Sequence, residues 1–313
     1  MYNHILHDHL DGGLRASTAK ELAETIKYEP LINVEDVNDF FDRSDCASLE
    51  DYLEAFTHTI ALMQSYDNLE RIAYEAAIDM SSNGINYYES RYAPFYSVND
   101  TLSPIDVIDA INSGFKQAEN EKGIISGLIL CGMRHDPENV RSVADLAIEI
   151  KDKIIGFDIA GPEYTFLPSL YKESFTKVIN AGINITIHAG EGDGVHSIQD
   201  ALDNGAKRIG HGVRIIEDIY NENSLGKTAD FILQNQIPLE ICITSNIHTN
   251  MYEDANNHPI SKLNELGFNI SLNTDNRLMS NTSVINELAM AKLSGIKDPE
   301  RLLKYSASDS FLN

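Results

Sequence analysis

Short apolar runs alternate with longer amphipathic stretches along this chain of 313 residues. The apolar runs predict eight β-strands, at residues 5–7, 84–91, 124–131, 154–159, 184–188, 208–210, 239–242 and 268–273. Helical spacing of apolar residues is clearest over residues 68–82, 103–121, 140–151 and 170–181. This alternation is typical of a parallel sheet covered by helices. Eight units in about 300 residues predict an α/β fold, a (β/α)8 TIM barrel with its active site at the C-terminal ends of the strands.

The whole chain, residues 1–313, is predicted to be a single domain, because no repeat, low-complexity tract or flexible linker divides it. One further amphipathic stretch begins at Ser48, which has the chemistry of a helix N-cap. Spacing alone makes its apolar face more typical of the core than of a binding site. That face consists of residues at i, i+3, i+4 and i+7, namely Leu49, Tyr52, Leu53 and Phe56.

Charge narrows the range of partners. The 24 Lys and Arg residues against 48 Asp and Glu residues give a formal net charge of −24. Nucleic acids and anionic membrane surfaces would be repelled, so neither is an expected partner, and a small neutral substrate is easier to accommodate. We expect no membrane span and no signal segment. Three widely spaced cysteines are typical of reduced thiols, so the expected location is the cytoplasm, while the oligomeric state is left open.

Residue types that bind metals follow several of the predicted strands. His7 and His9 come directly after an apolar run, and residues two apart in a strand project to the same side. His188, His211 and Asp275 each close or follow a later strand. Because the C-terminal ends of barrel strands meet at one face, we expect these side chains to converge there. Imidazole and carboxylate are ligands of zinc, so the pattern indicates a metal-dependent hydrolytic site.

Six motifs in this order and spacing resemble the adenosine deaminases of the amidohydrolase superfamily, and the resemblance covers nearly the whole chain. The motifs are His7-Asp8-His9-Leu10-Asp11-Gly12, Tyr88-Glu89-Ser90-Arg91-Tyr92-Ala93-Pro94, Asp158-Ile159-Ala160-Gly161-Pro162-Glu163, His188-Ala189-Gly190-Glu191, Gly210-His211-Gly212 and Asn273-Thr274-Asp275. Each motif alone is weak evidence, whereas six in register are specific. The resemblance implies hydrolysis of adenosine and 2′-deoxyadenosine to inosine and 2′-deoxyinosine with release of ammonia.

The resemblance also implies catalytic roles. Glu191, protonated in a poorly solvated pocket, would give a proton to purine N1 while an activated water attacks C6. His211 would orient that water and help to deprotonate it, and Asp275 would accept a hydrogen bond from it. One zinc ion per chain is implied, with four ligands: His7, His9, His188 and Asp275.

Substrate contacts are implied in the same way. The backbone N–H of Gly161 would donate to purine N3, and Asp11 would bind the ribose 5′-hydroxyl, which favours a nucleoside. The helix face described above would then form a hydrophobic gate over the ribose. Asn276 departs from the second aspartate that many members have, but its amide can donate to purine N7. The chain also stops at Asn313, where relatives usually continue with more helix.

Other functions must be weighed against the one that the resemblance implies. A binuclear amidohydrolase would use a carboxylated lysine or a glutamate at the end of the fourth strand, and residues 156–160 contain no lysine. The zinc deaminases with His-x-Glu and Pro-Cys-x-x-Cys motifs do not match. A deaminase of a related purine, such as adenine or a modified adenosine, and a non-catalytic binding protein on the same fold stay open.

Overall fold

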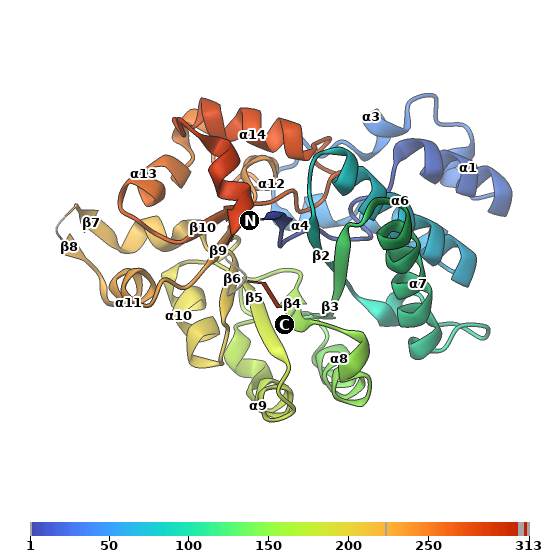
Figure 1. The fold of residues 1–313 in the computed structure, drawn as a ribbon, viewed down its shortest axis with the longest axis horizontal. Helices are drawn as coiled ribbons and strands as arrows, with labels where there is room; N and C mark the ends of the chain where they lie inside the picture. The colour runs from blue at the N-terminus through green and yellow to red at the C-terminus, as the bar shows by residue number, and fades with distance from the viewer. Residues whose placement is uncertain (1, 223, 306–309, 312–313) are drawn as a thin grey trace.

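The structure, a computed structural model, describes residues 2–222, 224–305 and 310–311. Within these residues, eight parallel strands form a nearly closed barrel, and helices surround it (Figure 1). This confirms the predicted (β/α)8 fold. The barrel strands are β1 (Tyr2–Ile5), β2 (Tyr87–Tyr92), β3 (Ile125–Met133), β4 (Gly156–Ala160), β5 (Asn184–Ala189), β6 (Arg208–His211), β9 (Leu239–Ile241) and β10 (Ile270–Leu272).

Fourteen α-helices are described, and most of them lie between successive barrel strands. They are α1 (Ala16–Ile26), α2 (Glu29–Ile32), α3 (Val37–Phe41), α4 (Leu49–Leu53), α5 (Phe56–Leu62), α6 (Tyr66–Ser82), α7 (Pro104–Lys122), α8 (Pro137–Glu149), α9 (Lys172–Asn180), α10 (Val195–Asp203), α11 (Lys227–Asn235), α12 (Ile243–His248), α13 (Ile260–Glu265) and α14 (Val284–Leu293). A small hairpin of β7 (Ile219–Asn221) and β8 (Ser224–Leu225) lies outside the barrel. Among the described residues, no helix is both long and apolar enough to cross a bilayer.

Local sequence signals explain where the long helices begin. The Ser65 side chain accepts a hydrogen bond from Asn68 at the start of α6, and Ser103 forms a capping box with Asp106 at the start of α7. The predicted helices at 68–82 and 103–121 therefore match α6 and α7 closely. Every residue of β2 and β4 is buried, as expected for strands of a parallel barrel that are covered on both faces.

Side chains help to close the barrel between its first and last strands. Asp8 and Asp275 form an isolated parallel bridge, in which the amide of His9 donates to the Asp275 carbonyl at 2.8 Å. The Asn273 side-chain oxygen accepts from the amides of Leu6 and His7 at 2.8 and 3.1 Å. A ninth strand, β11 (Lys304–Tyr305), pairs antiparallel with β1. The contacts that close the barrel thus lie in the segments that carry the first and last candidate metal ligands.

Two predicted elements were wrong in detail. The first strand is Tyr2–Ile5 and not residues 5–7, so His7 lies just beyond it, where the Asn273 side chain replaces strand pairing. The amphipathic stretch after Ser48 does begin at the predicted N-cap, with Ser48 accepting from the Asp51 amide. It then breaks at residues 54–55 into the short helices α4 and α5.

Candidate active site

A cavity of about 400 Å³ lies at the C-terminal ends of the barrel strands. Its volume is in the range of pockets that enclose small ligands. The cavity brings together most of the residues predicted from sequence, and His7 lies buried beside it. The predicted residues that line it are His9, Asp11, Leu49, Tyr52, Leu53, Phe56, Gly161, His188, Glu191, His211, Asp275 and Asn276.

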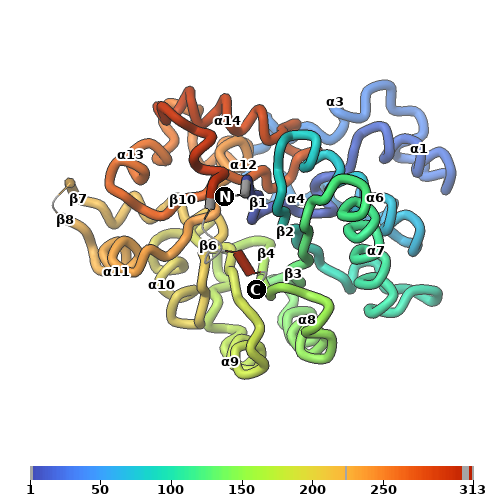
Figure 2. Tube along the Cα trace, viewed as in Figure 1, coloured from blue at the N-terminus to red at the C-terminus, as the bar shows by residue number. Residues whose placement is uncertain are grey.

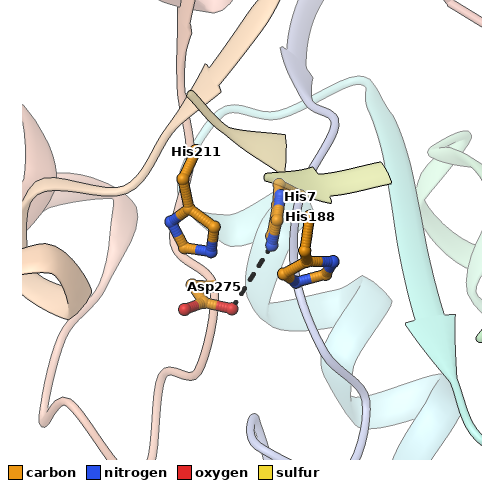
Figure 3. A group of neighbouring side chains, drawn as sticks. All are labelled: His7, His188, His211 and Asp275. Atoms are coloured by element: carbon orange, nitrogen blue, oxygen red, sulfur yellow. Dashed lines mark ion pairs between the residues drawn. The ribbon is translucent and has the colours of Figure 1, made fainter. Parts of the chain in front are cut away.

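Three histidines and one aspartate come together at the cavity, which His188, His211 and Asp275 line and beside which His7 lies. One nitrogen or oxygen atom from each of His7, His188, His211 and Asp275 lies within 4.8 Å of the corresponding atoms of the others. Figure 3 shows these side chains converging from separate segments of the chain. The ion pair that it marks joins His7 Nε2 and Asp275 Oδ1, which lie 3.4 Å apart. Both of these atoms are buried without a hydrogen-bond partner. Burying polar atoms unpaired is unfavourable, so this donor set fits a divalent metal ion.

His9 adds a fourth imidazole to this group. Its Nε2 lies 3.1 Å from His188 Nε2 and 3.5 Å from Asp275 Oδ1. Burial lowers the pKa of both His9 and His188, so both rings are neutral at pH 7. Neutral imidazole nitrogens that face one another across such a distance have the chemistry of ligands to one shared cation.

Buried carboxylates orient two of the histidines. His7 Nδ1 lies 2.9 Å from Glu240 Oε2, and His188 Nδ1 lies 2.9 Å from Asp158 Oδ2. A carboxylate only accepts, so each ring carries a proton on Nδ1, and in its neutral form it turns the lone pair of Nε2 toward the metal-ligand group. Arg91 joins the two carboxylates, at 2.6 Å to Asp158 and 2.9 Å to Glu240. Burial alone would raise the pKa of Glu240, but Arg208 and Arg91 hold it well below its usual range.

Backbone conformation at the site is unusual. His211 and Asp275 adopt φ values of 59° and 54°, in the left-handed region that side chains other than glycine rarely occupy. Such strain persists only where the surrounding structure holds it, and it is concentrated at functional sites. Here the left-handed turns direct the two side chains into the group of histidines at the ends of β6 and β10.

Glu191 stands beside the metal-ligand group on a loop held by another carboxylate. Glu163 accepts backbone hydrogen bonds from Gly190, Glu191 and Asp193 at 2.6, 2.9 and 3.0 Å. Glu191 Oε2 lies 3.5 Å from His211 Nε2. Burial, together with the nearby charges of Asp275 and Glu163, raises the pKa of Glu191 well above its usual range. The surroundings of Glu191 therefore favour the protonated form of a carboxyl group that faces the cavity.

The four residues of the predicted gate all line the cavity. Tyr52 is fully buried, and its hydroxyl lies 2.7 Å from Ser280 Oγ. Leu49 approaches the loop that carries Glu191, since its Cδ2 would lie 3.3 Å from a Cβ on Gly192. Spacing alone favoured a core role for this face. The structure shows that this face lines the cavity and that Tyr52, Leu53 and Phe56 also pack with the hydrophobic core.

The polar groups expected to read the substrate also face the cavity. Burial raises the pKa of Asp11 to about 7. Gly161 has φ of +96°, so a side chain there would be strained as well as close to Met133 at 3.3 Å. Asn276 Oδ1 is buried without a hydrogen-bond partner and lies 2.1 Å from where a Cβ on Gly12 would stand. Gly12 therefore makes the room that the Asn276 side chain occupies.

Comparison with known proteins agrees with this arrangement. The sequence profile described as Adenosine deaminase matches residues 3–311. An adenosine deaminase of Mycobacteroides abscessus is 39% identical over 298 residues, covering 91% of this chain and 82% of the relative. Adenosine deaminase 1 of Streptomyces coelicolor is 41% identical over 297 residues, covering 90% of this chain and 75% of the relative. This chain belongs to the adenosine deaminase family.

Members of this family are hydrolytic deaminases that act on C–N bonds, and the chain is such an enzyme. The fold agrees with solved structures. An N6-mAMP deaminase from Arabidopsis superposes with a TM-score of 0.84 at 26% identity, covering 100% of this chain and 94% of that one. Family membership thus leaves open which adenosine-like purine is the substrate.

Sequence reasoning missed the residues that hold the site in place. Glu163 orders the Glu191 loop, and Glu240 and Asp158 orient His7 and His188. A signal was present, because Asp158 and Glu240 are charged residues within predicted strands, and a buried charge needs a partner. The partners themselves, on distant strands, could be recognised only in the folded barrel.

Proposed function

We propose that the protein is a zinc-dependent adenosine deaminase that converts adenosine and 2′-deoxyadenosine to inosine and 2′-deoxyinosine with release of ammonia. The observation that carries this proposal is the position of Glu191, a buried carboxyl whose pKa is raised, beside the cluster of histidines and Asp275 at one cavity. A neutral carboxyl next to a metal-binding group is what hydrolytic deamination of a purine requires.

One zinc ion per chain, held by His7, His9, His188 and Asp275, is part of the proposal. The unpartnered His7 Nε2 and Asp275 Oδ1 support it. When bound, such an ion would supply a water molecule activated for attack at neutral pH. The charge state of Asp275 suits a ligand, because His7 and His211 hold its pKa well below the usual range against the effect of burial.

The protein groups then act on the purine. Glu191 would donate its proton to N1 as the attack at C6 breaks the ring's aromaticity, and Gly161 N–H would hold N3. Asn276 would donate its amide N–H to N7. Leu49, Leu53 and Phe56 would exclude water from the ribose side of the cavity.

A nucleoside is the proposed substrate, in preference to a nucleotide. Among the described residues that line the cavity there is no lysine or arginine. A 5′-phosphate would meet the Asp11 carboxyl and an overall charge of −24 without a compensating cation. The Arabidopsis relative named for N6-mAMP makes that nucleotide the second candidate substrate.

A substrate panel tests the proposal. The purified enzyme would be offered adenosine, 2′-deoxyadenosine, AMP, N6-methyl-AMP and adenine, and ammonia release and the ultraviolet change to hypoxanthine would be followed. We expect kcat/KM for the two nucleosides to exceed that of each nucleotide and of adenine by about 10²-fold or more, since like charge and lost contacts each cost several kcal/mol. Comparable kcat/KM for AMP or adenine would contradict the nucleoside assignment, and no turnover of any purine would contradict the activity.

A further inference from the structure

Helix α12 places a side chain directly against His211. The Asn246 Nδ2 atom lies 3.0 Å from His211 Nδ1, on the side of the ring away from the cavity. Both residues are buried. The direction of this hydrogen bond decides which nitrogen of His211 carries the proton, because a neutral imidazole has one donor and one acceptor.

The direction of the hydrogen bond between Asn246 and His211 follows from a backbone amide, which can act only as a donor. The amide of Ile260, at the start of α13, donates to His258 Nδ1 at 3.2 Å, and an N–H can only donate. Burial lowers the pKa of His258 to about 3, so its ring is neutral. Because Nδ1 accepts, the single proton of the His258 ring resides on Nε2.

The next step passes through the amide of Asn246. His258 Nε2 lies 3.3 Å from Asn246 Oδ1, so the ring donates to the amide oxygen. The amide therefore turns its NH₂ group toward His211, in agreement with the 3.0 Å contact from Nδ2. An NH₂ group only donates, so His211 Nδ1 must accept.

We infer that His258 and Asn246 form a hydrogen-bond relay that fixes His211 with its proton on Nε2, so that His211 donates into the cavity. This distinguishes His211 from His7 and His188, whose Nδ1 atoms face the carboxylates of Glu240 and Asp158. In their neutral forms those two rings have a lone pair on Nε2, whereas neutral His211 has an N–H there. His211 thus has no lone pair for a metal ion, although its Nε2 lies in the same cluster.

The relay changes the role that the sequence suggested for His211. A ring with hydrogen on Nε2 cannot accept a proton from the attacking water there, but it can donate a hydrogen bond to the water oxygen and fix its position. The consequence for catalysis rests on the proposed function. Asp275 Oδ1, which has no hydrogen-bond partner and lies within 4.8 Å of the His211 nitrogen, is the neighbouring acceptor. Asn246 and His258 are therefore positioning residues that act through His211.

Asn246→Asp reverses the relay with almost no change in shape. A carboxylate only accepts, so His211 would move its proton to Nδ1. Two-bond ¹H–¹⁵N NMR on metal-loaded protein labelled with ¹⁵N-histidine reports the tautomer, and a His211→Gln spectrum assigns the signal. We expect Nε2–H in the parent and Nδ1–H in Asn246→Asp. We also expect a fall of about 10²-fold in kcat with KM changed only a few-fold, as for loss of one catalytic donor.

Two further variants test whether the His211 tautomer depends on the direction of the hydrogen bonds or on packing around them. His258→Gln can accept from Ile260 and donate to Asn246 through its two amide atoms, so it should keep the parent tautomer of His211. His248→Gln changes a histidine of the same helix that lies outside the relay, and it should alter neither the tautomer nor kcat.

The NMR result stands independently of turnover. A proton on Nδ1 of His211 in the parent, or an unchanged tautomer in Asn246→Asp, would overturn the inference. The predicted tautomers in a protein that fails to deaminate adenosine would overturn the proposed function and leave the relay intact.

Discussion

The surroundings of two carboxyl groups in the cavity shift their pKa values in opposite directions. Burial and nearby negative charge raise the pKa of Glu191, whereas His7 and His211 lower that of Asp275. Groups whose pKa values are separated in this way divide acid and base roles between them. Glu191 is thus the group placed to give a proton, and Asp275 the group placed to attract cations.

The first prediction concerns Glu191. Glu191→Gln should keep the fold and the metal content but lower kcat by about 10²- to 10⁴-fold, because an amide cannot supply the proton to N1. Steady-state kinetics, circular dichroism and elemental analysis measure the three properties. Glu173→Gln, at an exposed position on α9, is the matched control and should behave as the parent. Turnover within a few-fold of the parent would show that Glu191 is not the acid.

The second prediction concerns Asn276, whose oxygen packs toward Gly12 and whose side chain borders the cavity. If its NH₂ group donates to purine N7, 7-deazaadenosine leaves that donor unpaired, at a cost of about 1 to 3 kcal/mol. The kcat/KM for the analogue should fall accordingly. Asn276→Ala should shrink the difference between the two substrates, and Gly12→Ala should do the same by displacing the amide. Equal kcat/KM for the two substrates in the parent would rule out this contact.

Helix α12 supports the site. Its residues Ser245 and Asn246 contact Asp275 and His211 at 2.6 and 3.0 Å. Helix α14 packs against it (Figure 2) and supplies Glu287, whose carboxylate accepts from the amides of Ile243 and Thr244 at 3.1 and 3.4 Å. These amides belong to the first turn of α12 and have no partner within the helix.

The third prediction follows from the pKa of Glu287, which burial raises from 4.5 to about 7. Folded protein keeps this proton up to about pH 7, whereas the unfolded chain releases it near pH 4.5, so the contribution to stability is complete below pH 4.5 and lost as pH rises to 7. The loss amounts to about 3 kcal/mol. Glu287→Gln lacks this titration, so its Tm should rise relative to the parent between pH 5 and pH 8. Calorimetry at both pH values tests this, with exposed Glu265→Gln as the control.

The sequence allowed the elements to be predicted where local chemistry determines them. Ser65 and Ser103 cap α6 and α7, and these helices match their predicted ranges. The first strand and the helix after Ser48 were misplaced because tertiary contacts decide them. The Asn273 side chain accepts from the His7 amide just beyond β1, and residues of both α4 and α5 line the cavity.

The barrel as a whole brings together segments that are far apart in sequence. The bridge between Asp8 and Asp275 joins the two ends of the barrel at the site itself. The sequence could predict that His7, His188 and Asp275 converge, because strand ends meet at one face. The sequence also predicted that His211 joins them, but not that its Nδ1 has an amide as partner, since that partner comes from α12.

The last prediction is that removing the metal weakens the whole barrel. An ion held by side chains that follow β1 and β10 and by one within β5 would link three distant segments. Binding only to the folded state adds about 4 kcal/mol when free metal is 1,000 times Kd. Chelation should therefore lower Tm by several degrees, and added Zn²⁺ should restore it. Elemental analysis should find one ion per chain. His9→Gln should lose the ion, and His211→Gln should keep it, because of these two residues His9 offers a lone pair to the cluster and His211 does not. Two ions per chain, or a Tm unaffected by chelation, would contradict the single-metal site.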